Sequence, residues 1–224
     1  MVRGERDYTQ RVLARIRPMG IGGGGILRLE DFETLLPKDP NPGTYFSLTN
    51  TQGEVWEGDR SGKYSLPQGY IGIYTLDFPQ PIPTIISAEV VFRRISGDLS
   101  YMNLRFEAVY EGIKHFPAIQ VYDNGTNLVL QYADSSSAYV TALTLGASPI
   151  DTKWHMLYFR VNIETKKYEL IQYDAARKTL PEAIYTTGAT GQQPYGSLAV
   201  YCKGKPTSSL ALSFDNLIVA YEDI

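Results

Sequence analysis

Short runs in which apolar and polar residues alternate dominate this chain, and they predict strands rather than helices. In the stretch 154–163, every second residue from Leu157 onward is apolar, the period expected of a half-buried strand. The polar turn 164–167 leads into a second apolar run at 168–173, and only 175–178 indicates a helical turn. Further stretches with strand character are 26–33, 56–66, 70–78, 85–94, 102–110, 118–122, 128–133, 139–145, 183–186, 197–201 and 210–221.

The first 25 residues differ from the rest and predict a separate N-terminal arm. Four apolar residues recur at the spacing of one helix face, namely Tyr8, Val12, Leu13 and Ile16. Arg11 and Arg15 lie four apart on another face, and the glycine-rich stretch 20–25 is typical of a flexible linker. Two interpretations stay open: a disordered tail, because so short a helix is marginal alone, or a docking arm that folds on a partner. The domain itself is expected at 26–224.

Composition supports an all-β domain and excludes several classes of partner. The chain of 224 residues has 43% hydrophobic residues, with 17 Tyr, 20 Gly and 13 Pro, a mixture typical of strands and turns. A net charge of −3 gives the body no electrostatic attraction for nucleic acid. Cys202 is the single cysteine, so no intramolecular disulfide is expected. With neither a signal-peptide pattern nor a membrane-spanning run, we expect a virion or cytoplasmic location.

Several short motifs are similar to those of one fold family. The Trp-His pair at 154–155, followed by a turn and a second strand, resembles the late hairpin of concanavalin A-like (laminin-G-like) jelly-roll sandwiches. Three further motifs resemble strands of the same family: Leu29–Glu33 its first strand, Ser61–Leu66 another strand and Phe214–Val219 its closing strand. The resemblance implies an antiparallel two-sheet jelly-roll sandwich over 26–224, with its first and last strands paired so that Leu27 lies beside the strand of Leu217. Because this fold carries lectins, glucanases, adhesion modules and virion proteins, the site must decide the function.

Catalytic patterns are weak in the sequence. Glycoside hydrolysis needs two carboxylates flanking the scissile bond, which the family's glucanases supply as E-x-D-x-x-E. Glu30, Asp31 and Glu33 come closest, but adjacent residues of a strand point to opposite faces. Neither His115 nor His155 adjoins a nucleophile motif, and Cys202 lies in an apolar strand typical of a core. We therefore expect no enzyme.

Two kinds of binding site are predicted. In the family that the motifs resemble, a structural calcium ion often lies between first-strand acids and the closing-strand Asp, which here are Glu30, Glu33 and Asp215. Asp215 could instead cap a turn or pair with Arg28, and no other cofactor is expected. Sugar binding needs exposed aromatic faces beside amides, and the expected glycan-binding residues are Tyr101, Asn103, Tyr122 and Tyr132. They come from a wider set of candidates: Tyr45, Trp56, Tyr70, Tyr110, Tyr139, Tyr195, Asn124, Asn127, Gln131 and Gln193.

These expectations leave two main functions. The first is a structural or adhesion protein of a virus or phage particle, which self-associates or binds other virion proteins through Tyr8, Arg11, Val12, Leu13, Arg15 and Ile16. The second is a carbohydrate-binding module that recognises a polysaccharide, and a virion protein of the first kind can also bind glycans. No nucleic acid and no membrane partner is expected.

Overall fold

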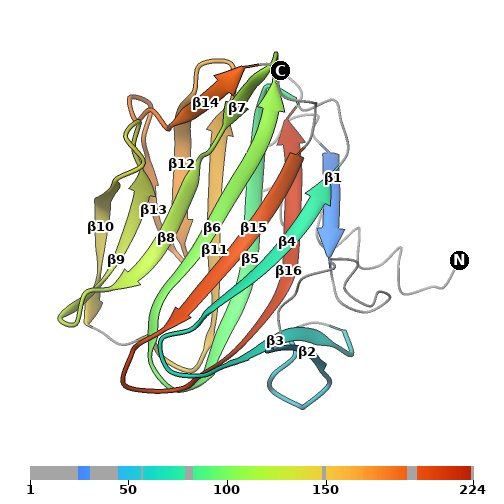
Figure 1. Cartoon of the computed structure of the whole chain (residues 1–224), viewed down its shortest axis with the longest axis vertical. Coiled ribbons are helices and arrows are strands. Elements are labelled where there is room, and N and C mark those ends of the chain that lie inside the picture. Colours follow the sequence, from blue (N-terminus) through green and yellow to red (C-terminus); the bar gives the residue numbers. More distant parts are fainter. Residues whose placement is uncertain are drawn as a thin grey trace, which may run out of the picture.

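The protein is all-β, as the alternation predicts. The computed structural model describes residues 25–30, 45–56, 58–78, 83–147, 150–190 and 196–222, and these contain strands and turns but no helix. No helix within these ranges is therefore long and apolar enough to cross a membrane. The proposed arm lies outside the described residues, except for Gly25 at its end. Figure 1 shows the strands arranged in two stacked sheets.

The first sheet contains the two ends of the domain. In spatial order its strands are β13 (Ala176–Thr179), β12 (Lys167–Tyr173), β11 (Trp154–Asn162), β5 (Ile85–Ser96), β16 (Leu210–Glu222), β3 (Ser61–Leu66) and β2 (Phe46–Thr49), while β1 (Gly25–Glu30) also pairs with β16. The pairing of β1 with β16 is antiparallel and sets Glu30 opposite Leu217. The predicted pairing of first and last strands is confirmed.

The second sheet forms the opposite face of the sandwich. In spatial order its strands are β10 (Tyr139–Ala147), β9 (Asn127–Ala133), β8 (Ala118–Asp123), β6 (Leu99–Tyr110), β15 (Gly196–Gly204) and β4 (Ile71–Phe78), while the short β7 (Ile113–His115) joins β6 to β14 (Thr187–Thr190). All pairs in both sheets are antiparallel. We call this second sheet the pocket sheet, because its outer face carries the hollow described below.

The core fills the space between the sheets with alternate residues from each strand. On β6, Met102, Leu104 and Phe106 are fully buried, so their neighbours 101, 103 and 105 point outward. Cys202 on β15 is fully buried as predicted. The packing there is tight, because a Cβ on Gly72 would lie 2.9 Å from the Cys202 sulfur.

Two local expectations are wrong. Residues 175–178 do not form a helical turn: the strand β13 begins at Ala176, and Asp174, with a positive φ of 49°, lies in the turn that leads from β12 into it. The large aromatic side chain of Trp154 predicts a buried core position, but it is only half-buried. Leu157 and Phe159 occupy the inward positions of β11, which places the even-numbered Trp154 on the outer face. There its ring lies 5.7 Å from that of Trp56, which is 40% exposed.

Candidate functional site

A hollow on the outer face of the pocket sheet is the strongest candidate for a functional site. Its volume is about 400 Å³, and side chains from four strands surround it. The lining residues are Tyr101, Asn103 and Arg105 from β6, Gln120 and Tyr122 from β8, Tyr201 from β15 and Tyr139 from β10. We call this hollow the tyrosine pocket.

Strand register brings these residues together from distant parts of the chain. Tyr201, Asn103 and Gln120 lie directly opposite one another on β15, β6 and β8, forming one row across the sheet. The next row places Tyr101 opposite Tyr122. Because residues two apart on a strand share a face, both rows point away from the core. The pocket therefore has a floor of phenols and amides fixed by backbone pairing.

Arg105 occupies a third row with small neighbours on both sides. Ala199 lies opposite it on β15, and Ala118 lies opposite it on β8. Both alanines are short and buried, so they add no polar group beside the arginine. Its guanidinium carbon lies 5.2 Å from the centre of the Phe116 ring, a cation–π contact that holds the group in place.

Tyr139 closes the pocket from the outermost strand of the sheet. Its phenol oxygen accepts a 2.6 Å hydrogen bond from the side-chain amide of Asn103, which is buried. Burial raises the pKa of Tyr139, while the Asn103 hydrogen bond and the charge of Arg105 act in the opposite direction. Burial likewise raises the pKa of Tyr101. Both phenols are therefore protonated at neutral pH and can donate hydrogen bonds to a ligand.

A chain of side-chain hydrogen bonds orients the amide of Gln120, which lies in the same row as Asn103. Gln120 Nε2 donates to Gln131 Oε1 at 2.7 Å, and Gln131 Nε2 donates to Thr141 Oγ1 at 3.1 Å. These contacts run from β8 through β9 to β10. They fix the Gln120 amide beside the pocket, so its polar atoms are organised before any ligand arrives.

Three of the four predicted glycan-binding residues lie together in this pocket. Tyr101, Asn103 and Tyr122 all line it, and Tyr139 from the wider candidate set joins them. Tyr132 does not, because it lies opposite the inward-facing Ile119 and its ring packs 5.3 Å from that of Tyr168 in the core.

Sequence reasoning missed three members of the pocket, Arg105, Gln120 and Tyr201. Arg105 shares a face with Tyr101 and Asn103 at a spacing of two, and that regular alternation of larger polar residues was the available signal. Nothing in the sequence alone sets Tyr201 opposite Asn103, since that contact depends on pairing between strands nearly a hundred residues apart.

The expected calcium ligands are only partly within the described residues. Asp215 is fully buried, and its Oδ2 accepts hydrogen bonds from Ser61 Oγ at 2.7 Å and from the backbone N–H of Trp56 at 3.3 Å. The backbone of Glu30 is described but its side chain is not, and Glu33 lies outside the described residues. In the part of the chain that is described, no group of three or more His, Cys, Asp or Glu side chains is placed to hold a metal ion. Calcium binding at Glu30, Glu33 and Asp215 stays a prediction.

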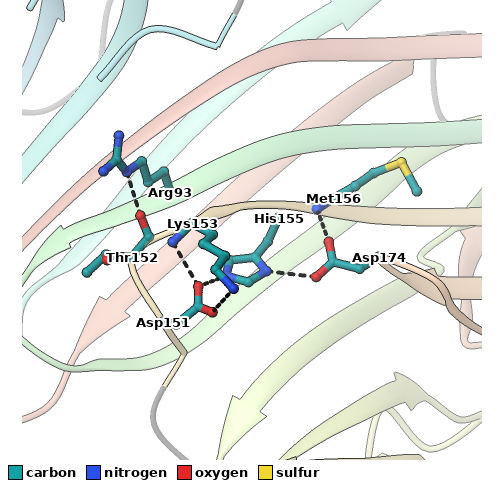
Figure 2. A network of polar contacts seen from close by, with 7 residues as sticks. All are labelled: Arg93, Asp151, Thr152, Lys153, His155, Met156 and Asp174. Carbon is teal, nitrogen blue, oxygen red and sulfur yellow. Dashed lines mark hydrogen bonds and ion pairs between the residues drawn. The ribbon is translucent and has the colours of Figure 1, made fainter. Parts of the chain in front are cut away.

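The two histidines lie away from the pocket, in contrasting surroundings. His155 is nearly buried between two carboxylates: Nδ1 lies 2.8 Å from Asp174 Oδ2 and Nε2 lies 3.0 Å from Asp151 Oδ1 (Figure 2). Burial lowers the pKa of His155, but the hydrogen bonds and charges of Asp174 and Asp151 outweigh it, so the net pKa is raised. Burial lowers the pKa of His115 to about 4, and this ring contacts the phenol of Tyr185 at 3.2 Å.

Comparison with solved structures relates this fold to carbohydrate-active proteins. A carbohydrate esterase from the Shiga toxin-encoding bacteriophage phi24B matches with a TM-score of 0.55 at 12% identity, covering 90% of this chain and 100% of that one. An alginate lyase from Chlorella virus gives 0.55 at 10% identity, covering 89% and 100%. An endo-β-1,4-glucuronan lyase from the fungus Trichoderma reesei gives 0.52 at 11% identity, covering 88% and 96%. No protein-family model matches the chain, and no curated protein matches its sequence.

These structures correct the expectation that the protein is not an enzyme. That expectation rested on missing glucanase carboxylates, but an esterase and two lyases share the fold without being glucanases. Paired carboxylates are a requirement of glycoside hydrolysis, whereas lyases and esterases break other bonds. The missing pattern therefore argues against one reaction and leaves other carbohydrate chemistry open. The chain has an antiparallel two-sheet β-sandwich, and these three carbohydrate-active proteins have a similar fold.

Proposed function

We propose that the protein binds a polysaccharide in the tyrosine pocket. The observation that carries this proposal is the row of Tyr201, Asn103 and Gln120, flanked by Tyr101 and Tyr122 on the same face. Phenols and amides both donate and accept hydrogen bonds, as sugar hydroxyls require. Aromatic rings add apolar surface for the C–H faces of a sugar.

The open shape of the pocket supports an extended ligand rather than a small buried one. The lining residues come from the edge strand β10 and from three strands farther inside the sheet, β8, β6 and β15, so the hollow crosses several strands and can hold more than one sugar of a chain. A polysaccharide segment fits this geometry better than an isolated monosaccharide does.

Cleavage of the bound chain is a second candidate function, and it is supported by the pairing of Tyr139 with Asn103. A phenol held by a buried amide, within electrostatic reach of Arg105, is a group that can transfer a proton next to a fixed positive charge. No carboxylate is among the described residues that line the pocket, so hydrolysis by paired carboxylates is not the chemistry proposed.

A location on a virus or phage particle is the setting that we propose for this activity. Two of the three similar structures come from viruses. The arm, with its apolar stripe and arginines, would tether the domain to another copy or to another particle protein. Removal of residues 1–25 should then abolish oligomerisation or particle incorporation while the sandwich stays folded; normal assembly of the truncated protein would remove this part of the proposal.

The binding proposal is tested with a glycan array, followed by calorimetry on the oligosaccharide that binds best. Tyr122→Ala removes one wall of the pocket and should weaken binding by at least about tenfold. Tyr70→Ala is the matched control, because Tyr70 is 53% exposed and lies outside the pocket. Equal affinities for both variants, or no binding on the array, would contradict the proposal.

The cleavage proposal needs a separate readout on the same ligand. The size distribution of the polysaccharide is followed by gel filtration during incubation with the protein. If the protein is catalytic, the chains shorten, and Tyr139→Phe stops the shortening while most of the binding remains. Shortening that persists unchanged in Tyr139→Phe would rule out the role proposed for this phenol.

A further inference from the structure

We infer that the polysaccharide is acidic and that Arg105 receives a sugar carboxylate. This inference rests on the proposed function, since it names the chemical class of ligand for the same pocket. Its starting point is the state of the Arg105 side chain.

The guanidinium of Arg105 has N–H donors that form no hydrogen bond within the described residues. It makes no ion pair or hydrogen bond with any residue within the described ranges, and its one recorded contact is the face of the Phe116 ring. Stacking on a ring leaves the N–H groups in the guanidinium plane available, because these point outward from the edge of the group. Arg105 is therefore held in position while its hydrogen-bonding edge stays open.

The charge around Arg105 favours an anion from outside the chain. Among the described residues that line the pocket, Arg105 is the only charged side chain, and the others are phenols and amides. The nearest carboxylate along the same face of β6, Glu107, forms a 3.0 Å ion pair with Lys114. A local positive charge in a chain of net charge −3 is a specific feature of this site rather than a property of the whole surface.

The geometry favours a carboxylate on a sugar ring. A guanidinium binds a planar carboxylate through two parallel N–H···O bonds, which are stronger than bonds to neutral hydroxyls. Arg105 lines the same hollow as Tyr101 and Asn103, so a sugar ring in that hollow can bring its carboxylate to the guanidinium. The protonated phenols of Tyr101 and Tyr139 supply donors for hydroxyls on the same sugar or the next one.

A second cation lies outside the pocket lining, in the row of Tyr101. Lys203 is opposite Tyr101, two rows from Arg105, and forms no ion pair within the described residues. Four residues of β-strand separate these rows, a distance of about 13 Å. A chain of several acidic sugars can contact both cations, so affinity should increase with the length of the oligosaccharide.

Calorimetry on paired probes tests the inference. Each probe is a hexasaccharide prepared from glucuronan, alginate or polygalacturonate, used both as the acid and with its carboxyl groups reduced to alcohols. Wild-type protein should bind at least one acidic form about tenfold or more tightly than its reduced counterpart, as loss of a charge-assisted hydrogen bond implies. Arg105→Gln should remove that difference, and Arg105→Lys should restore part of it. Arg177→Gln, at an exposed position on β13, is the control and should behave as wild type.

The outcomes separate this inference from the proposed function. If the acidic and the reduced form bind with equal affinity and Tyr122→Ala abolishes both, the pocket binds polysaccharide but the inference of an acidic ligand is wrong. Tighter binding of the acid that survives unchanged in Arg105→Gln would overturn the role of Arg105. Failure to bind any carbohydrate, acidic or neutral, would overturn the proposed function itself. Circular dichroism of each variant shows that the sandwich is folded, so a loss of binding can be assigned to the site.

Discussion

The side-chain amide of Asn103 donates a 2.6 Å hydrogen bond to the phenol oxygen of Tyr139. The strands that carry these two residues are separated in the sheet by β8 and β9. Asn103 is on β6 and Tyr139 begins the edge strand β10, so the bond ties the rim of the sheet to its centre. Asn103 has two structural roles, because it orients the phenol that closes the pocket and also lines the pocket itself.

Replacement of Asn103 should therefore affect both stability and binding. In Asn103→Ala the buried hydrogen bond is lost, and the free energy of unfolding should fall by about 1–2 kcal/mol. Ligand affinity should fall as well, since Tyr139 loses its fixed position. Urea denaturation and calorimetry measure the two effects, with Asn127→Ala on β9 as the control. Wild-type stability together with wild-type affinity in Asn103→Ala would contradict this role.

The paired tryptophans on the opposite sheet lead to a prediction about stability. Trp154 is half-buried against the exposed Trp56, so Trp154→Ala should cost about 1–2 kcal/mol. Phe159 on the same strand is fully buried, and Phe159→Ala should cost about 3–5 kcal/mol. Urea denaturation of both variants makes the comparison. An equal or larger loss in Trp154→Ala would mean that this ring supports the core after all.

His155 should make stability depend on pH in a defined direction. Its pKa is raised in the folded state, so the folded protein holds this proton more tightly than the unfolded chain does. The stabilisation from the Asp151–His155–Asp174 contacts is fully present below the ordinary histidine pKa of 6.5 and is lost as the pH rises through the raised value (Figure 2).

The measurement is the difference in unfolding free energy between wild type and His155→Gln across this range of pH. The difference should be largest under acidic conditions and shrink as the pH increases. His115, whose lowered pKa of about 4 acts in the opposite direction, is present in both proteins, so its contribution cancels. A difference that grows with pH would show that His155 is held in its neutral form.

Cys202 should not react with thiol reagents while the protein is folded. Burial raises the pKa of its thiol to about 12, and the side chain is fully enclosed between the sheets. Because the thiolate is the reactive form, a thiol reagent at neutral pH should modify Cys202 only after unfolding. The rate of modification with and without denaturant measures this. Rapid labelling of the native protein would show that the sheets open near β15.

Much of the fold could be predicted from the alternation of residue types, because a strand with one buried face must place apolar residues at every second position. The stretch 154–163 shows this most clearly, and the pairing of β1 with β16 followed from the end motifs. Trp154 illustrates the limit of the pattern. The aromatic ring of Trp154 indicated a core position. However, the inward positions of β11 are occupied by Leu157 and Phe159, so Trp154 lies on the outer face.

The site could be predicted only where its residues share a strand or a residue type. Tyr101 and Asn103 were found by their chemistry, since aromatic and amide side chains are what sugars require. Arg105 shares a strand face with Tyr101 and Asn103, but it was missed because the sequence does not show that this face carries a hollow. Tyr132 lies outside the pocket, because its ring packs against Tyr168, and the sequence does not show which face of the sheet a tyrosine occupies.

The central claim, that carbohydrate binds on the outer face of the pocket sheet, is tested most directly by backbone amide chemical-shift mapping. The isotope-labelled protein is titrated with the oligosaccharide that binds most tightly on the array. We predict that the largest shifts fall on β6, β8 and β15, centred on the row of Tyr201, Asn103 and Gln120. Shifts confined to β5, β11 and the Trp56–Trp154 pair on the other sheet would contradict the account.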